Sequence, residues 1–309
     1  MFASLTRPNY PRAAIGFGNK TVSAVALRKE GTARYSIKSA ATAEISTDIL
    51  SPSFDESNII DTYRMVEVLD SLVIESGLGG QKKWSVSVPS ASARTAIITL
   101  DDAPASKTEL EDVLDWKTET AFGVPAGELR VSRLKISLSA DSKIRYFASA
   151  IRLSNLDEFE RVFDELGWQV GLVLPRAIGE SNWFSNFSGD SLLISTQEDG
   201  FTALLMRNQE PVVVRSVTCA ESEKDDEVYR LLVYYQDRFA PDAGKGGLDH
   251  LMVLGDGMDR ERVRKITVEA TGDALDIVRP DELGFEIPSG GLSFEDLAAP
   301  AGLAALGWN

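Results

Sequence analysis

Two glycines near the start of the chain lie in a turn whose backbone could hold a phosphate group. An apolar run leads into this turn, whose residues are Gly16, Phe17, Gly18, Asn19, Lys20 and Thr21. Glycine allows positive φ and leaves backbone N–H groups uncovered, which a phosphate-binding loop needs. A plain β-hairpin needs the same residue types. The stretch therefore predicts a strand, a turn and a second strand. The turn could be a phosphate-binding loop or belong to a plain β-hairpin.

A second stretch, residues 191–207, repeats this layout in the later part of the chain. Its polar turn contains Gln197, Asp199 and Gly200, and a further apolar strand follows at 212–216. Asp199 is expected to close this turn together with Gly200. Two such hairpins at the starts of two half-chains indicate a duplicated architecture.

The segments around the hairpins alternate between the periods of helices and strands. Between them, residues 91–150 predict a strand, a helix and two strands, with Ser106 and Glu109 forming a capping box at the start of the helix. The other expected helices span 58–76, 156–166, 177–187, 226–239, 260–271 and 293–306, and the other strands 35–45, 84–88, 168–174, 251–254 and 274–278. Loops are expected at 141–143 and 240–247.

Composition excludes several classes of function. The 309 residues carry 32 basic and 47 acidic side chains, and the net charge of −15 disfavours a nucleic-acid partner. Cys219 is alone and His250 has no second ligand spaced for a metal, so neither predicts a metal site. No apolar run reaches the length of a membrane span, and no signal peptide is recognised, so we expect a cytoplasmic protein.

The order and spacing of four segments resemble the actin-like ATPase superfamily and, within it, the PilM family of type IV pilus assembly proteins. These segments are 84–90, 110–125, 155–175 and 296–304. The resemblance implies an α/β, actin/Hsp70-like (ribonuclease H-like) fold with two lobes, in which a small α+β module replaces the usual actin insertion. It divides the chain into a first lobe (1–90 and 151–185), an inserted protein-interaction module (91–150) and a second lobe (186–309) with a shortened lid.

The resemblance also implies a nucleotide site, from which this chain departs. The family's first metal-organising Asp falls at Gly16, its second at Ser195, and its following glycine at Gln197. Asp256 interrupts the adenosine turn Gly255-Asp256-Gly257, and little chain is left for a lid between Ser216 and Leu251. We therefore expect a pseudo-ATPase with no catalytic residue and no metal ligand, which binds ATP with Mg²⁺ weakly or not at all. Residual nucleotide contacts are expected from Gly18, Asn19, Lys20, Thr21, Gly255 and Gly257, although Lys20 also reads as an ordinary loop lysine.

The partner implied by the resemblance is the cytoplasmic tail of a PilN-like inner-membrane protein. Such a tail would lie in a groove between the first lobe and the inserted module, and the scaffold would sit at the cytoplasmic face of the inner membrane with other pilus components, in a system for twitching motility. Candidate contacts are the apolar residues of the module, Leu114, Trp116, Phe122, Val124 and Pro125. The alternative is that they form the core of the module.

Three other functions remain open from the sequence. One is an active Mg-ATP-binding ATPase of the PilM type, with Glu119 as a substitute carboxylate. Another is a cytoplasmic platform component of a type II secretion system. A sugar or acid kinase shares the fold and ranks last, because the chain lacks a second acid placed to deprotonate a hydroxyl.

Overall fold

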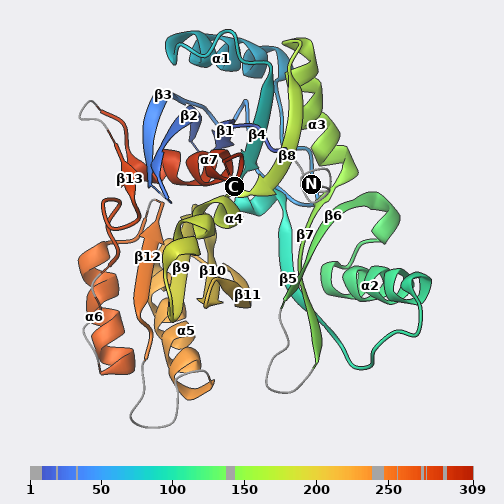
Figure 1. The fold of residues 1–309 in the computed structure, drawn as a ribbon, viewed down its shortest axis with the longest axis vertical. Coiled ribbons are helices and arrows are strands. Elements are labelled where there is room, and N and C mark those ends of the chain that lie inside the picture. Colours follow the sequence, from blue (N-terminus) through green and yellow to red (C-terminus); the bar gives the residue numbers. More distant parts are fainter. Residues whose placement is uncertain are drawn as a thin grey trace. The chain divides into compact units, whose positions relative to one another are not determined.

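The computed structural model describes residues 9–18, 20–32, 34–136, 143–238, 247–255, 257–272, 275, 277–287 and 291–308. The chain divides into two compact units. Unit 1 comprises Met1–Ser92, Asp157–Trp183 and Pro280–Asn309, and unit 2 comprises Ala93–Leu156 and Phe184–Arg279. Each unit has its own sheets and helices (Figure 1).

Unit 1 is built on a six-stranded mixed sheet in the order β13-β3-β2-β1-β4-β8. The strands are β1 (Ala13–Phe17), β2 (Thr21–Gly31), β3 (Arg34–Glu44), β4 (Lys83–Val88), β8 (Gln169–Pro175) and β13 (Phe285–Glu286). β1 pairs antiparallel with β2 and parallel with β4, so it lies in the middle of the sheet. The helices of this unit are α1 (Thr62–Glu75), α4 (Arg176–Ser181), α7 (Phe294–Leu306) and, from Asp157 onward, α3 (Leu153–Glu165).

The two faces of this sheet bury different kinds of side chain, because successive residues of a strand point to opposite faces. Phe17 packs against Phe159 of α3 with ring centroids 5.2 Å apart. Gly16 lies in register between Ser23 of β2 and Ser87 of β4, so these small residues share the opposite face. The small side chains leave room for a helix to approach the sheet closely.

Helix α7 fills that room. Nearly all of its residues are buried, and its sequence is rich in alanine with one glycine and one proline. Ser293 caps its first turn by accepting a hydrogen bond from Glu295 N at 3.1 Å. Trp183 Nε1 donates to the carbonyl of Ala298 at 2.8 Å, which fixes the helix to the chain that follows α4. The expected second lobe included this segment, whereas the segment packs in unit 1, because its partner strands β1 and β2 lie far away in the sequence.

Unit 2 contains a four-stranded sheet in the order β11-β10-β9-β12. Its strands are β9 (Asp190–Gln197), β10 (Gly200–Arg207), β11 (Glu210–Thr218) and β12 (His250–Leu254). Helices α5 (Lys224–Arg238) and α6 (Arg260–Thr271) pack together, and Leu232 and Val263 join the apolar side chains of β9 and β10 in one core. The expected second hairpin and its third strand are confirmed.

The same unit contains a three-stranded sheet in the order β5-β7-β6. Its strands are β5 (Arg94–Leu100), β6 (Leu129–Ile136) and β7 (Ile144–Arg152), with α2 (Lys107–Phe122) and a short 3-10 helix, η3 (Ala126–Glu128), between β5 and β6. This is the strand, helix, strand, strand order expected for the inserted module. Ser106 is confirmed as the cap of α2, since Glu109 N donates to Ser106 Oγ at 3.1 Å. The return bond differs from the expected capping box, because Glu109 Oε2 accepts from Ala105 N at 2.6 Å and not from the N–H of Ser106.

A few elements differ from the expectation. The helix expected at 177–187 is divided into α4 and a 3-10 helix, Asn182–Asn186. In place of a strand at 274–278, the described residues show one bridge from Ile277 to Leu251; residues 274 and 276 lie outside the described part. The expected loop at 240–247, except Gly247, and residues 141 and 142 of the expected turn also lie outside the described residues.

Candidate functional site

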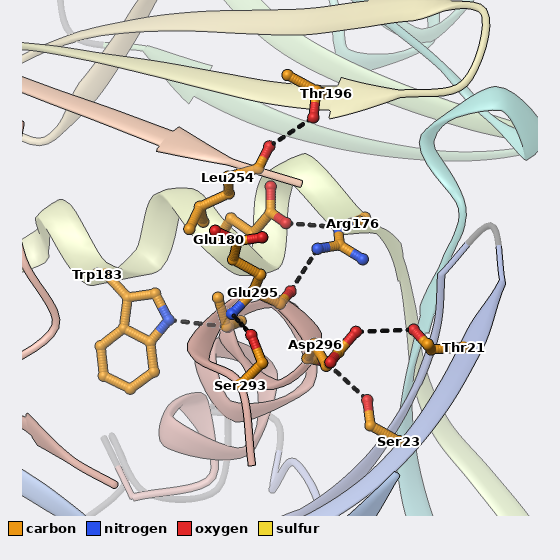
Figure 2. Close-up of polar contacts among 11 residues, drawn as sticks. Thr21, Ser23, Arg176, Glu180, Trp183, Thr196, Leu254, Ser293, Glu295 and Asp296 are labelled. Carbon is orange, nitrogen blue, oxygen red and sulfur yellow. Dashed lines mark hydrogen bonds and ion pairs between the residues drawn. The ribbon is translucent and has the colours of Figure 1, made fainter. Parts of the chain in front are cut away.

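The turn of the first hairpin is closed by its own backbone and by α7. Gly18 N donates to the carbonyl of Thr21 at 2.7 Å, so this N–H already has a partner within the turn. Thr21 Oγ1 donates to Asp296 Oδ1 at 2.9 Å, and Ser23 Oγ donates to the carbonyl of Asp296 at 2.7 Å (Figure 2). The first turn of α7 thus brings a carboxylate to the hairpin where the positive end of the helix would otherwise attract an external anion. Asn19 lies outside the described residues.

Gly16, where the resemblance places the family's first Asp, faces the ring of Pro300. A Cβ added at Gly16 would lie 2.7 Å from both Cδ and Cγ of Pro300. Carbon atoms do not approach so closely without a shift of the backbone or the ring, so α7 excludes any side chain at this position. The glycine is therefore required by the packing of α7 on β1.

A buried ion pair lies beside the same hairpin. Arg176 Nε donates to Glu180 Oε1 at 2.6 Å, and Arg176 Nη2 donates to the carbonyl of Glu295 (Figure 2). Glu180 is fully buried, and its Oε2 has no hydrogen-bond partner in the described part of the chain. Arg176 Nη1 lies 3.2 Å from the position that a Cβ of Gly18 would occupy. A guanidinium of the chain itself thus provides the positive charge next to the turn.

Lys20 lines an open cleft against α1. The cleft has a volume of about 880 Å³, and α1 contributes Arg64, Glu67 and Glu75 to its wall. Glu44 and Thr21 also line it. Lys20 is exposed and shares the lining of this cleft with three carboxylates, and the sequence did not predict the cleft.

A buried lysine forms a hydrogen bond to the backbone of the second hairpin. Ser195, where the resemblance places the family's second Asp, is buried in β9 and pairs in register with Leu254 of β12. Lys224, only 2% exposed, donates from Nζ to the carbonyl of Gln197 at 2.7 Å. Asp199 lies in the turn, where its carbonyl accepts from Cys219 N at 3.0 Å. The chain places the ammonium of Lys224 at the end of β9.

The two glycines after β12 are both required by the fold of unit 2. Gly255 has φ +95°, and a Cβ there would lie 2.5 Å from Thr196 Oγ1. Thr196 Oγ1 itself donates to the carbonyl of Leu254 at 3.0 Å (Figure 2). Gly257 has φ +80°, and its missing Cβ would lie 3.1 Å from Lys224 Nζ. Positive φ and close packing explain these glycines without a ligand. Asp256 lies outside the described residues.

A cleft beside Gly257 has a volume of about 860 Å³ and an acidic lining. The charged residues that line it are Glu221, Asp225, Asp259 and Arg262. The guanidinium of Arg262 forms an ion pair with Asp225, so the cation among these lining residues is already paired. The described lining has no aromatic ring to stack on a purine, and its carboxylates repel phosphate.

The proposed contact residues of the inserted module divide into exposed and buried ones. Trp116 is 61% exposed on α2, and Pro125 is exposed after it. Phe122 is only 2% exposed, and Val124 and Leu114 are buried as well. Leu114, Phe122 and Val124 are therefore core residues of the module. Since their side chains cannot meet a partner without unfolding, Trp116 and Pro125 remain as candidate contacts.

Glu119, the substitute carboxylate of the alternative ATPase, has a local role. Its Oε1 accepts a hydrogen bond from Ala126 N at 2.8 Å, at the start of η3.

His250 begins β12, and its ring packs edge-on against Phe187 with centroids 4.4 Å apart. Burial raises the pKa of the Cys219 thiol, which disfavours a reactive thiolate.

Known structures define the class of this fold. The PilM-PilN type IV pilus biogenesis complex matches with a TM-score of 0.77 and 13% identity, over 98% of this chain and 100% of that chain. A Bacteroides thetaiotaomicron protein with an actin-like ATPase fold and unknown function matches with a TM-score of 0.50 and 14% identity, over 91% and 95% of the two chains. The ethanolamine utilization protein EutJ from Carboxydothermus hydrogenoformans matches with a TM-score of 0.50 and 7% identity, over 97% and 92%.

These matches show that the chain has the actin-like ATPase fold, as its sequence predicts. At such low identities the likeness concerns the fold alone. No protein-family model matches the chain, and no curated protein matches it in sequence. None of the described helices is both long enough and apolar enough to cross a membrane.

Proposed function

We propose that this protein is a cytoplasmic scaffold of a type IV pilus assembly machine that docks the cytoplasmic tail of a PilN-like inner-membrane protein. The likeness to the PilM-PilN complex supports the proposal, because it extends over 98% of this chain and 100% of that one with a TM-score of 0.77. Through this tail the protein is held at the cytoplasmic face of the inner membrane, where it meets the other components of the machine.

In this proposal the scaffold works without a nucleotide cycle. The observation that carries this step is the contact between Gly16 and Pro300, which leaves no space for a carboxylate on β1. Ser195 supplies no carboxylate on β9, and Arg176, the cation packed near Gly18, is already bonded to Glu180. Mg²⁺ bound to a nucleotide needs oxygen ligands and phosphate-binding N–H groups, and these residues offer neither arrangement. ATP then binds weakly or not at all.

The exposed side of α2 is the proposed docking surface. Trp116 offers a large rigid contact area, and its 61% exposure is unusual for a tryptophan near the middle of a helix. Tryptophan is among the residues that most often dominate binding energy in protein interfaces. Pro125 follows the helix and is also exposed.

Binding of the tail tests this function. A peptide that copies the cytoplasmic tail of the PilN-like protein of the same organism is titrated into the full chain, with and without Mg-ATP. The expected result is saturable binding with the same affinity in both conditions. Tail binding that requires Mg-ATP would favour the active-ATPase alternative, and no binding at all would remove the docking role.

A further inference from the structure

Strand β6 presents a long, regular and unpaired edge. It pairs with β7 over its full eight residues, Leu129–Ile136, without a shift in register. Among the described strands, none pairs with its other edge. In an antiparallel ladder every second residue directs its N–H and C=O away from the neighbouring strand, so β6 offers unpaired groups beyond its first residue. The N–H of Leu129 itself donates to the carbonyl of Ala126. Natural proteins usually shorten, bulge or cover such an edge.

The side chains of β6 add an apolar anchor and two cations to this edge. Leu134 is 60% exposed, next to the buried Phe147 of β7. Arg130 and Lys135 are exposed and form no ion pair with a described residue. Arg133 of the same strand is different, because it pairs with carboxylates of α2. These two cations give the strand a local positive charge in a chain of net charge −15.

We propose that β6 accepts an extended acidic segment of the partner protein as a fourth strand of this sheet. Backbone hydrogen bonds to the free edge provide affinity, and alternate side chains provide specificity. Carboxylates of the segment meet Arg130 and Lys135, while an apolar residue packs on Leu134. The inference names the binding mode and the charge of the docking tail and so rests on the proposed function.

Charge decides between this occupant and a second copy of the chain. Antiparallel pairing of β6 with itself would place the region of Arg130 and Lys135 against the same cations of the other copy, and like charges on adjacent strands are destabilising. The same two cations could also serve only to keep other strands away from the edge. That role predicts no bound segment of any charge.

The experiment uses a six-residue valine–glutamate peptide, with glutamate at both ends and valine at the four positions between, titrated into the full chain. Its two glutamates lie on opposite faces of the added strand, as Arg130 and Lys135 do on β6. Hydrogen exchange of the amides of residues 129–136 and the affinity are both measured. The expected result is slower exchange at alternate residues of β6, with affinity at least about tenfold lower for the same peptide N-methylated on its backbone. A valine–lysine peptide is expected to bind more weakly than the valine–glutamate peptide.

Charge-reversed variants locate the site. Lys135→Glu combined with Arg130→Glu is expected to weaken binding of the acidic peptide and strengthen binding of the valine–lysine peptide. Lys265→Glu, at an exposed position of α6, is the matched control and is expected to change neither. Since these side chains are exposed, the variants are expected to fold.

Three outcomes would overturn the inference: no binding of the acidic peptide, equal binding of its N-methylated form, or binding that leaves the exchange of β6 unchanged. The proposed function is judged separately with the tail peptide and a Trp116→Ala variant. If the tail binds through Trp116 but does not protect β6, the docking role stands and the fourth-strand inference fails.

Discussion

Pro300 of α7 lies so close to Gly16 of β1 that a Cβ at position 16 would be 2.7 Å from two atoms of the proline ring. The sequence resemblance to PilM proteins places a metal-organising carboxylate at this position. In this protein the C-terminal helix occupies the space instead, and Asp296 and Arg176 provide the charges around the neighbouring turn. Residues of the chain itself therefore fill the space around the first hairpin and supply the charges there.

Adding a side chain at Gly16 tests this packing. Gly16→Ala is expected to lower the free energy of unfolding by about 1–3 kcal/mol, because the methyl group overlaps the Pro300 ring. Urea denaturation measures the change. Gly79→Ala is the matched control, since a Cβ there meets nothing within 4 Å.

A double-mutant cycle separates this overlap from a general effect on β1. In a Pro300→Ala background the cost of Gly16→Ala is expected to fall by at least about 0.5 kcal/mol, since the two residues are in contact. The same cost in both backgrounds would mean that the contact does not restrict position 16.

The ion pair between Arg176 and Glu180 is expected to be essential for the stability of unit 1. Arg176→Met leaves the fully buried Glu180 carboxylate without its cation and is expected to cost about 3–5 kcal/mol. Arg161→Met, at an exposed position of α3, is the control in the same denaturation experiment. The double variant with Glu180→Met should lose less than Arg176→Met alone, and a larger loss would argue against the pairing.

Asp101 links stability to pH. The hydrogen bond and charge of Lys117, followed by the charge of Lys143, hold the pKa of the Asp101 carboxyl below its usual value. A lowered pKa in the folded state stabilises the fold above the usual Asp value of about 3.9, and this contribution is lost as the pH falls through the lowered pKa.

Asp101→Asn is therefore expected to lower the melting temperature slightly at pH 7, and the difference from the native chain should shrink at pH 3. The effect is small because the carboxylate is exposed and screened by solvent. Asp102→Asn, the exposed neighbour, is the control. A difference that persists unchanged at pH 3 would contradict the linkage.

Trp116 is expected to act in binding and not in folding. Trp116→Ala should weaken the binding of the partner tail about tenfold, a cost typical of an interface anchor, and leave the melting temperature nearly unchanged. Tyr229→Ala removes another exposed aromatic ring, on α5, and should leave tail binding as it is. A similar loss in both variants would argue against a specific role of α2.

Local signals in the sequence predicted most elements of the fold. The hairpins, the module with its Ser106 cap, and α6 follow from patterns that lie within a few residues of one another. The same kind of signal could have assigned Phe122 to the core of the module. Leu114, Thr118 and Phe122 recur at helical spacing and form the buried stripe of α2. Trp116 falls between these positions and is exposed.

The details of the candidate site could not be predicted, because they depend on contacts between distant segments. Nothing near Gly16 in the sequence indicates that Pro300 will pack on it. Lys224 precedes a run of acidic residues and looks like a surface lysine, yet the structure buries it against Gln197. Such positions are decided by tertiary packing, which local patterns do not contain.

Calorimetric titration of the folded protein with ATP, with and without Mg²⁺, tests the central claim most directly. The chain packs its own residues around the first hairpin, so we expect no detectable heat of binding in either condition. Micromolar binding that depends on Mg²⁺ would contradict the account, because it would require carboxylates and space that the contact between Gly16 and Pro300 excludes.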